Sequence, residues 1–132
     1  MASDRYSIEF DLTDGEEILV LRLIGDYDMT ADEDAIKKVA EEIKEHGTQK
    51  LLCDYRECNL KTSITAQYDR PKTISEMGIP KTTRIAGVHP EITEDIKFME
   101  DVYNNQGYAM KAFTDYREAL DWLKEGRLTE EV

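Results

Sequence analysis

The alternation of strand-like and helix-like segments constrains the fold of this chain most. Residues 6–12 alternate apolar and polar side chains, and a Thr-Asp-Gly-Glu sequence at 13–16 separates them from the apolar run Ile18–Ile24. A period of two is typical of a strand with one exposed face, and Asp-Gly favours a tight turn. We therefore expect the chain to open with a β-hairpin.

Three more strands follow the hairpin, and a helical segment follows each strand from the second onward. We expect strands at 51–56, 83–88 and 108–113, and helices at 30–46, 62–77, 93–106 and from about 115 to 126. Thr30 and Glu33 have the spacing of a capping box at the first helix, and a polar loop is expected at 57–61. Pro71 interrupts the second helix, which we expect to be either kinked or split near Asp69. This order predicts an α/β fold with a five-stranded mixed sheet and helices packed on it.

The length and the net charge of the chain exclude several classes of function. The 132 residues carry a net charge of −12 with 40% hydrophobic side chains, which fits one domain at 1–126 and a tail at 127–132. The acidic balance argues against nucleic acid as a partner. Neither a membrane-length apolar run nor a secretory signal pattern occurs, so we expect a cytoplasmic protein without stable membrane insertion. Two cysteines spaced five apart and two histidines do not predict a metal or cofactor site.

The closing third of the chain carries a family resemblance. Its residues are Asn105-Gln106-Gly107, then Phe113-Thr114-Asp115, then the helix segment 118–123 with sequence Glu-Ala-Leu-Asp-Trp-Leu. With the element order, these residues resemble the SpoIIAA-like (STAS/SEC14-type) family, which has the STAS-domain fold of anti-sigma-factor antagonists. The resemblance implies a non-enzymatic binding role, for a regulatory protein partner or a lipophilic ligand.

The same resemblance points to one phosphorylation position. Phospho-switch members of the STAS family have a serine at the start of the helix after the third strand, and this pattern places the serine on Ser63 and the strand aspartate on Asp54. Thr62, Ile64 and Thr65 stand where that motif has Asp, Ser/Thr and Gly. Ser63 and Thr62 are therefore candidates for a phosphoacceptor or anion contact, or they are simply caps of the helix.

Polar side chains near two strand ends are the next candidates. Asp54, Arg56 and Cys58 follow the third strand's apolar run, and His89 follows the fourth strand. Ligands of open α/β sheets usually bind outside the carboxyl ends of the strands. His89 beside Cys58 or Asp54 would allow an enzymatic site; the alternative is a strand-end histidine and an ordinary buried cysteine.

The middle of the chain differs from both ends in charge. Residues 50–84 carry a net +3, whereas 1–49 carry −9 and 85–132 carry −6. The seven bases of this stretch are Lys50, Arg56, Lys61, Arg70, Lys72, Lys81 and Arg84. They could form a basic face for an anionic ligand, or they could pair internally with the acidic helices. The apolar residues at 64, 68, 74, 77 and 79 could form a lid, an interaction surface or core.

Together these patterns favour a non-catalytic binding or regulatory module that acts through residues 62–80 and the nearby strand ends. The candidate ligand or partner surface comprises Asp54, Arg56, Cys58, Tyr68, Arg70, Lys72, Met77 and His89. One alternative is a carrier of a small lipophilic or anionic ligand held between the interrupted helix and the sheet. A second alternative is an enzyme that uses His89, and an edge hairpin makes a homodimer possible.

Overall fold

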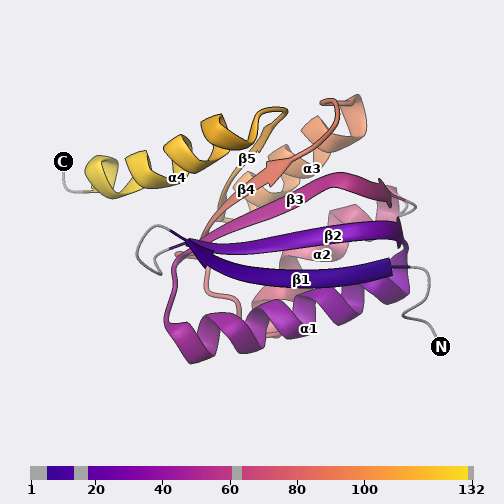
Figure 1. The fold of residues 1–132 in the computed structure, drawn as a ribbon, viewed down its shortest axis with the longest axis horizontal. Helices are drawn as coiled ribbons and strands as arrows, with labels where there is room; N and C mark the ends of the chain where they lie inside the picture. Colours follow the sequence, from indigo (N-terminus) through magenta and orange to yellow (C-terminus); the bar gives the residue numbers. More distant parts are fainter. Residues whose placement is uncertain (1–5, 14–17, 61–63, 131–132) are drawn as a thin grey trace.

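The computed structural model describes residues 6–13, 18–60 and 64–130, without the side chains of Thr13, Met29, Leu60, 64–69 and 125–130. Its sheet contains β1 (Tyr6–Thr13), β2 (Ile18–Tyr27), β3 (Lys50–Leu60), β4 (Arg84–Val88) and β5 (Ala109–Phe113) in sequence order. β1 is antiparallel to β2, and every other neighbouring pair is parallel (Figure 1). The predicted five-stranded mixed sheet is confirmed, with β1 at one edge.

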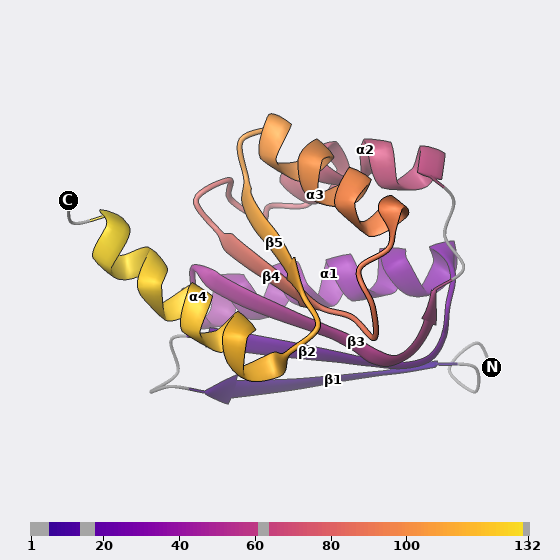
Figure 2. The ribbon, with the colours of Figure 1, turned by 90° about the horizontal axis from the view of Figure 1, so that it is seen from above.

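Helices cover the two faces of the sheet unequally. They are α1 (Met29–His46), α2 (Ile64–Glu76), α3 (Glu94–Asn105) and α4 (Tyr116–Glu130). In Figure 2, α2 and α3 lie side by side, whereas α4 lies apart from them beside the other face of the sheet. Parallel strands run in the same direction, so each needs a crossover connection. The helices between them return the chain to the end of the sheet at which the next strand begins.

Each face of the sheet has its own core. Leu19, Leu21, Leu51 and Cys53 belong to the larger core, which contains residues of α1, α2 and α3. The alternate strand residues, including Val20 and Leu52, belong to a smaller core with α4. The period of two along β2 and β3 therefore assigns successive side chains to opposite layers.

The first helix begins earlier than the sequence predicted. Asp28, rather than Thr30, is the N-cap, and its side chain accepts a hydrogen bond from the Ala31 N–H at 3.0 Å. The capping-box prediction for Thr30 and Glu33 is therefore wrong, because an aspartate two residues earlier already satisfies the first helical donors. Gly47 ends α1 with a φ of +68°, which favours glycine, and its N–H donates to the Ile43 carbonyl at 2.7 Å.

The loop predicted at 57–61 is wrong for most of its length, because β3 continues to Leu60. After an irregularity in the pairing between Arg22 and Ile24, residues 57–60 pair with residues 24–27 of β2. The polar sequence conceals this extension, since the segment is held by backbone pairing and exposes Glu57 and Asn59. β3 therefore extends well beyond Asp54, the last residue that pairs with β4.

The later helices settle the remaining boundaries. α2 is one helix that contains Pro71, rather than two helices divided near Asp69. Thr93 caps α3, which buries Ile96, Met99, Val102 and Tyr103 as predicted. α4 continues through Gly126 to Glu130, past the point where the sequence predicted a tail to begin. Within the described chain, no helix is long and apolar enough to cross a membrane.

Candidate functional site at the carboxyl ends of the strands

A buried ion pair connects three elements at the carboxyl end of β2. The Arg70 guanidinium of α2 donates from Nε to Asp32 Oδ2 at 3.0 Å and lies 2.6 Å from Asp32 Oδ1 through Nη2. Tyr27, at the end of β2, donates its hydroxyl to Asp32 and accepts from Arg70 Nη2 at 3.3 Å. The side chains of Arg70 and Asp32 are only 14% and 7% exposed, so α2 is joined to α1 and β2 by a largely dehydrated charge pair.

Electrostatics keep the Arg70 guanidinium charged despite its burial. Burial by itself would lower the pKa of Arg70, but the negative charge of Asp32 and the nearby tyrosines keep that pKa well above its usual value. Burial raises the pKa of Tyr27 well above the ordinary range, so its hydroxyl stays protonated and can donate. Tyr27, Asp32 and Arg70 thus form one hydrogen-bonded group that connects β2, α1 and α2.

His89 follows β4 and is fully buried. Its ring stacks on Tyr55 of β3 with a centroid separation of 4.9 Å and an interplanar angle of 16°. Gly87 permits this position, because a Cβ added there would lie 2.9 Å from His89 Nε2. A residue with a side chain at position 87 would therefore collide with the His89 ring.

The imidazole of His89 is held in its neutral form. Burial, with a smaller effect of the Arg70 charge, lowers the pKa of His89 to about 4. Neither ring nitrogen has a hydrogen-bond partner among the described residues. His89 therefore forms no hydrogen bond with Asp54 or Cys58. A neutral, enclosed ring without a positioned partner is poorly suited to act as a general base.

Asp54 and Arg56, both candidates near the end of the third strand, form an ion pair with each other. Arg56 donates from Nε to Asp54 Oδ1 and from Nη2 to Oδ2, both at 2.9 Å, and Arg22 lies 3.9 Å from Oδ2. Burial would raise the pKa of Asp54, but the hydrogen bonds from Arg56 hold it below its usual value. The Arg56 guanidinium lies 5.1 Å from the Tyr116 ring centre, so this pair faces α4, away from Arg70.

The two cysteines are not activated. Burial raises the pKa of Cys53 to about 11 and that of the half-buried Cys58 to about 12. Because the thiolate is the nucleophile, neither side chain is reactive at neutral pH. Cys53 is a buried hydrophobe, as the sequence predicted.

A small cavity lies between the sheet and the three helices on its larger core. Its volume is about 30 Å³, and the lining is mostly aliphatic. The polar atoms of the lining come from Arg70, Tyr55, Tyr103 and Cys53. The remaining lining residues are Leu21, Ala35, Ile36, Val39, Leu51, Ile74, Ile79, Ile85 and Met110.

The other predicted surface residues have separate positions. Lys72 and Met77 are exposed on α2 and just after it, and Met77 is 41% exposed. Thr62, Ser63 and the side chain of Tyr68 lie outside the described residues, so the phosphoacceptor prediction stays a prediction. Of the predicted surface, Asp54 and His89 are buried and Arg70 is mostly buried.

The bases of residues 50–84 do not gather on one face in the part of the chain that is described. Arg70 is buried against Asp32, whereas Arg56 and Arg84 contact aromatic rings of α4. Lys72 and Lys81 are exposed on the segments around α2. Arg56 and Arg70 therefore follow the alternative of internal pairing, because each forms an ion pair with an aspartate. They do not contribute to a common basic face.

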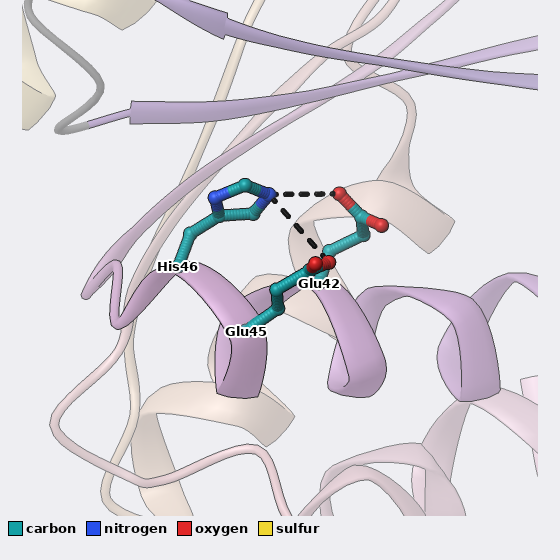
Figure 3. Close-up of side chains that lie close together, drawn as sticks. All are labelled: Glu42, Glu45 and His46. Carbon is teal, nitrogen blue, oxygen red and sulfur yellow. Dashed lines mark ion pairs between the residues drawn. The ribbon is translucent and has the colours of Figure 1, made fainter.

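One cluster of possible metal ligands lies far along α1 from this site. His46 Nε2 is 3.5 Å from Glu42 Oε1 and 3.8 Å from Glu45 Oε2 near the end of the helix (Figure 3). The ligand atoms of all three lie within 4.8 Å of one another. Glu45 and His46 are exposed, and such exposed acidic groups are common without a metal.

The architecture around this site occurs in solved bacterial proteins. A protein from Shewanella loihica of the uncharacterised DUF3478 family, described as SpoIIAA-like, aligns at 22% identity over 90% of this chain and 94% of its own, with a TM-score of 0.59. An anti-sigma-factor antagonist from Mycobacterium paratuberculosis aligns at 15% over 89% and 95%, with a TM-score of 0.58. Phosphorylated SpoIIAA from Bacillus aligns at 17% over 87% and 97%, with a TM-score of 0.55.

These similarities establish the fold: the chain has the SpoIIAA-like STAS fold, as its closing motifs predicted. At these identities they do not transfer a binding role. No family model matches the sequence, and no curated protein matches it.

Sequence reasoning missed three residues of the site. Asp32 is one of several acidic residues at the start of α1, so its sequence position did not distinguish it. Tyr27 lies beyond the predicted end of β2. Tyr55 was within the predicted third strand but was not singled out. No local signal marked the pairing, because Asp32 and Tyr27 lie 38 and 43 residues from Arg70 in the sequence.

Proposed function

We propose that this chain is a non-catalytic regulatory module that binds a protein partner through the outer surface of α2 and α3 and the nearby strand ends. The observation that carries the proposal is exposed apolar surface on this pair of helices. Met77 and Phe98 are 41% and 38% exposed, and they are the exposed large hydrophobic residues of the described chain. Met77 directly follows the last residue of α2, and Phe98 lies in the first half of α3, the helix beside α2.

The chemistry of the strand ends supports binding over catalysis. A nucleophile and base pair made from Cys58 and His89 needs a thiol that ionises readily and an imidazole that accepts its proton. The raised pKa of Cys58 and the lowered pKa of His89 oppose both requirements. Asp54 is already occupied by two hydrogen bonds from the Arg56 guanidinium.

The shared fold supports a protein as the first partner class to test. Two of the solved structures described above are anti-sigma-factor antagonists. The net charge of −12 and the dispersed bases also favour a protein partner over a polyanion. We keep the predicted site on residues 62–80 and add Phe98 of α3 to it.

The experiment compares surface variants in quantitative affinity capture from an extract of the source organism. Met77→Asp with Phe98→Asp places charges on the proposed surface, and Lys37→Asp on the exposed side of α1 is the control. We expect a partner that the wild type and the control retain equally and that the double variant loses at least tenfold. If all three proteins retain the partner, or if only Lys37→Asp loses it, the partner binds outside the proposed surface.

Phosphorylation of Ser63 is a separate part of the proposal. A phosphate on Ser63 would add negative charge beside the first residue of α2, and the start of a helix favours negative charge. We expect Ser63→Glu to change the affinity for the partner identified above, and Ser63→Ala to resemble the wild type without kinase. Unchanged affinity in Ser63→Glu would remove the phosphorylation switch while leaving the binding surface in place.

A further inference from the structure

We infer that β1 is the contact strand of a homodimer, in which two copies of this chain pair their β1 strands antiparallel, with Ile8 opposite Ile8 of the second copy. This inference goes beyond the proposed partner surface, because β1 is an edge strand of the sheet and that surface belongs to α2 and α3. It depends on three features: a closed edge at β5, an open edge at β1, and side chains that complement a second copy in one register.

The β5 edge of the sheet is closed by side chains of α3. Asn104 donates to the Met110 carbonyl and accepts from the Met110 N–H, both at 3.0 Å. The Ala112 N–H donates to Glu100 Oε2 at 2.7 Å. These bonds occupy the backbone groups with which a further strand would pair, and covered edges of this kind prevent association of sheets. A second copy is therefore not expected at β5.

The β1 edge has free backbone groups. β1 pairs with β2 on one side and ends the sheet on the other (Figure 1). The Leu12 N–H donates to the Asp11 side chain at 2.9 Å, so this donor points away from β2. Because backbone groups of an antiparallel strand alternate in direction, those of Ile8 and Phe10 also point away from β2. Among the described residues no strand pairs with them, so they can accept a second strand.

The apolar side chains of β1 are incompletely covered. Tyr6, Ile8, Phe10 and Leu12 pack against the larger core but are only partly buried. Edge strands that stay single are commonly protected by lysine or proline, and β1 contains neither. A second β1 would continue the sheet and cover the remaining apolar surface of these side chains.

The pairing centred on Ile8 is self-complementary. It places Tyr6 opposite Phe10 and Ser7 opposite Glu9, once on each side of the twofold axis. Ser7 and Glu9 then form pairs without backbone hydrogen bonds, where opposite side chains lie closest, and a hydroxyl can donate to a carboxylate there. The aromatic pair on the other face also stabilises antiparallel strands.

The acids of β1 disfavour two neighbouring registers. Centring the pair on Glu9 would place this carboxylate opposite its own copy, and centring it on Phe10 would place Glu9 opposite Asp11. Like charges directly opposite each other destabilise a strand pair. Both registers would also use the Leu12 N–H, which Asp11 already occupies. Pairing of residues 6–10 around Ile8 avoids both costs.

The test measures the dissociation constant of the dimer by sedimentation of the full chain over a series of concentrations. Ser7→Glu places a carboxylate opposite Glu9 and should raise this constant at least tenfold, whereas Ser7→Lys places an ion pair there and should lower it. Lys111→Glu is the control, because it changes an exposed charge on β5 and should leave the constant as it is. A wild type that stays monomeric at every concentration would overturn the inference.

Two more variants test the strand and its register. Ile8→Pro removes the central N–H, which points away from β2, so the hairpin should stay folded while the dimer is lost. Adding Glu9→Lys to Ser7→Glu exchanges the two charges and should restore the dimer. A dimer that survives both Ser7→Glu and Ile8→Pro would place the interface elsewhere, and an exchange without recovery would reject the register. Urea unfolding checks the fold of each variant, and the two Ser7 variants decide by themselves if Ile8→Pro does not fold.

Discussion

α1 and α2 pack against the same face of the sheet, yet they are attached to it in different ways. α1 has a side-chain cap at its start, a glycine cap at its end and a buried stripe that includes Ile36, Val39 and Ile43. The described part of α2 has a proline in its middle, few buried apolar residues and one buried ion pair, formed by Arg70. α1 is thus fixed by a broad apolar stripe, whereas the described half of α2 combines two buried apolar residues, Pro71 and Ile74, with one buried ion pair.

This difference in attachment suggests different roles for the two helices: α1 supports the fold, whereas α2 can take part in binding. Local stability is lowest where few apolar contacts are buried, and binding elements are commonly found in such places. The proposed partner surface involves α2 for this reason. The predictions below test the contrast in order of decreasing effect.

Removing the charge of Arg70 should have the largest effect. Arg70→Ala leaves Asp32 buried without its partner, which typically costs about 3–5 kcal/mol of unfolding free energy. Urea unfolding measures the loss, and hydrogen exchange should show that α2 is released before α1.

The double variant Asp32→Leu with Arg70→Leu is the control for that loss. It removes both charges together, so most of the stability should return. A double variant as unstable as Arg70→Ala would mean that shape, rather than unpaired charge, causes the loss.

Acidification should weaken the region next to α2 through His89. The pKa of this imidazole is about 4 in the folded protein and about 6.5 when unfolded, so the unfolded chain binds the proton first as the pH falls. Stability should be fully present above about pH 6.5 and should decline toward pH 4 by about 3 kcal/mol. Thermal unfolding at a series of pH values measures this slope.

His89→Phe keeps an aromatic ring against Tyr55 and removes the titration. It should therefore flatten the slope between pH 6.5 and 4 relative to the wild type. An equal slope in the wild type and His89→Phe would assign the acid response to other groups.

Gly87→Ala should destabilise the strand end by a smaller amount. The added Cβ would lie 2.9 Å from His89 Nε2, and the ring cannot retreat easily because Tyr55 stacks on it. Overpacking of this kind costs about 1–3 kcal/mol, measured by urea unfolding. The same change made in a His89→Ala background should cost clearly less, and an unchanged cost would refute the steric explanation.

The cap of α1 should contribute least. Asp28→Ala removes the acceptor for the Ala31 N–H and should cost about 1 kcal/mol. Thr93→Ala, which removes the corresponding cap of α3, is the matched comparison. Thermal unfolding should show two small, similar losses. A loss at Asp28 as large as that of Arg70→Ala would contradict the contrast between the helices, because α1 would then also depend on a single polar contact.

The order of elements was predictable because each depends on neighbouring residues. Alternation in β1 and the helical stripe of α3 were visible locally, and the structure has both. The end of β3 was not predictable, because Glu57 and Asn59 are polar and belong to the strand only through pairing with β2. The candidate site was predicted in part: its edge of the sheet and Arg70 were named, but Asp32 and Tyr27 were not.

The sequence by itself determined the sheet-and-helix order and the fold, since the period of apolar residues decides which face of each element is buried. Only the tertiary structure decided which polar groups share that interior. Asp32 and Arg70 are 38 residues apart and become partners because the helices that carry them pack on one face of the sheet. Burial then turns an acid and a base with ordinary sequence surroundings into an ion pair between α1 and α2.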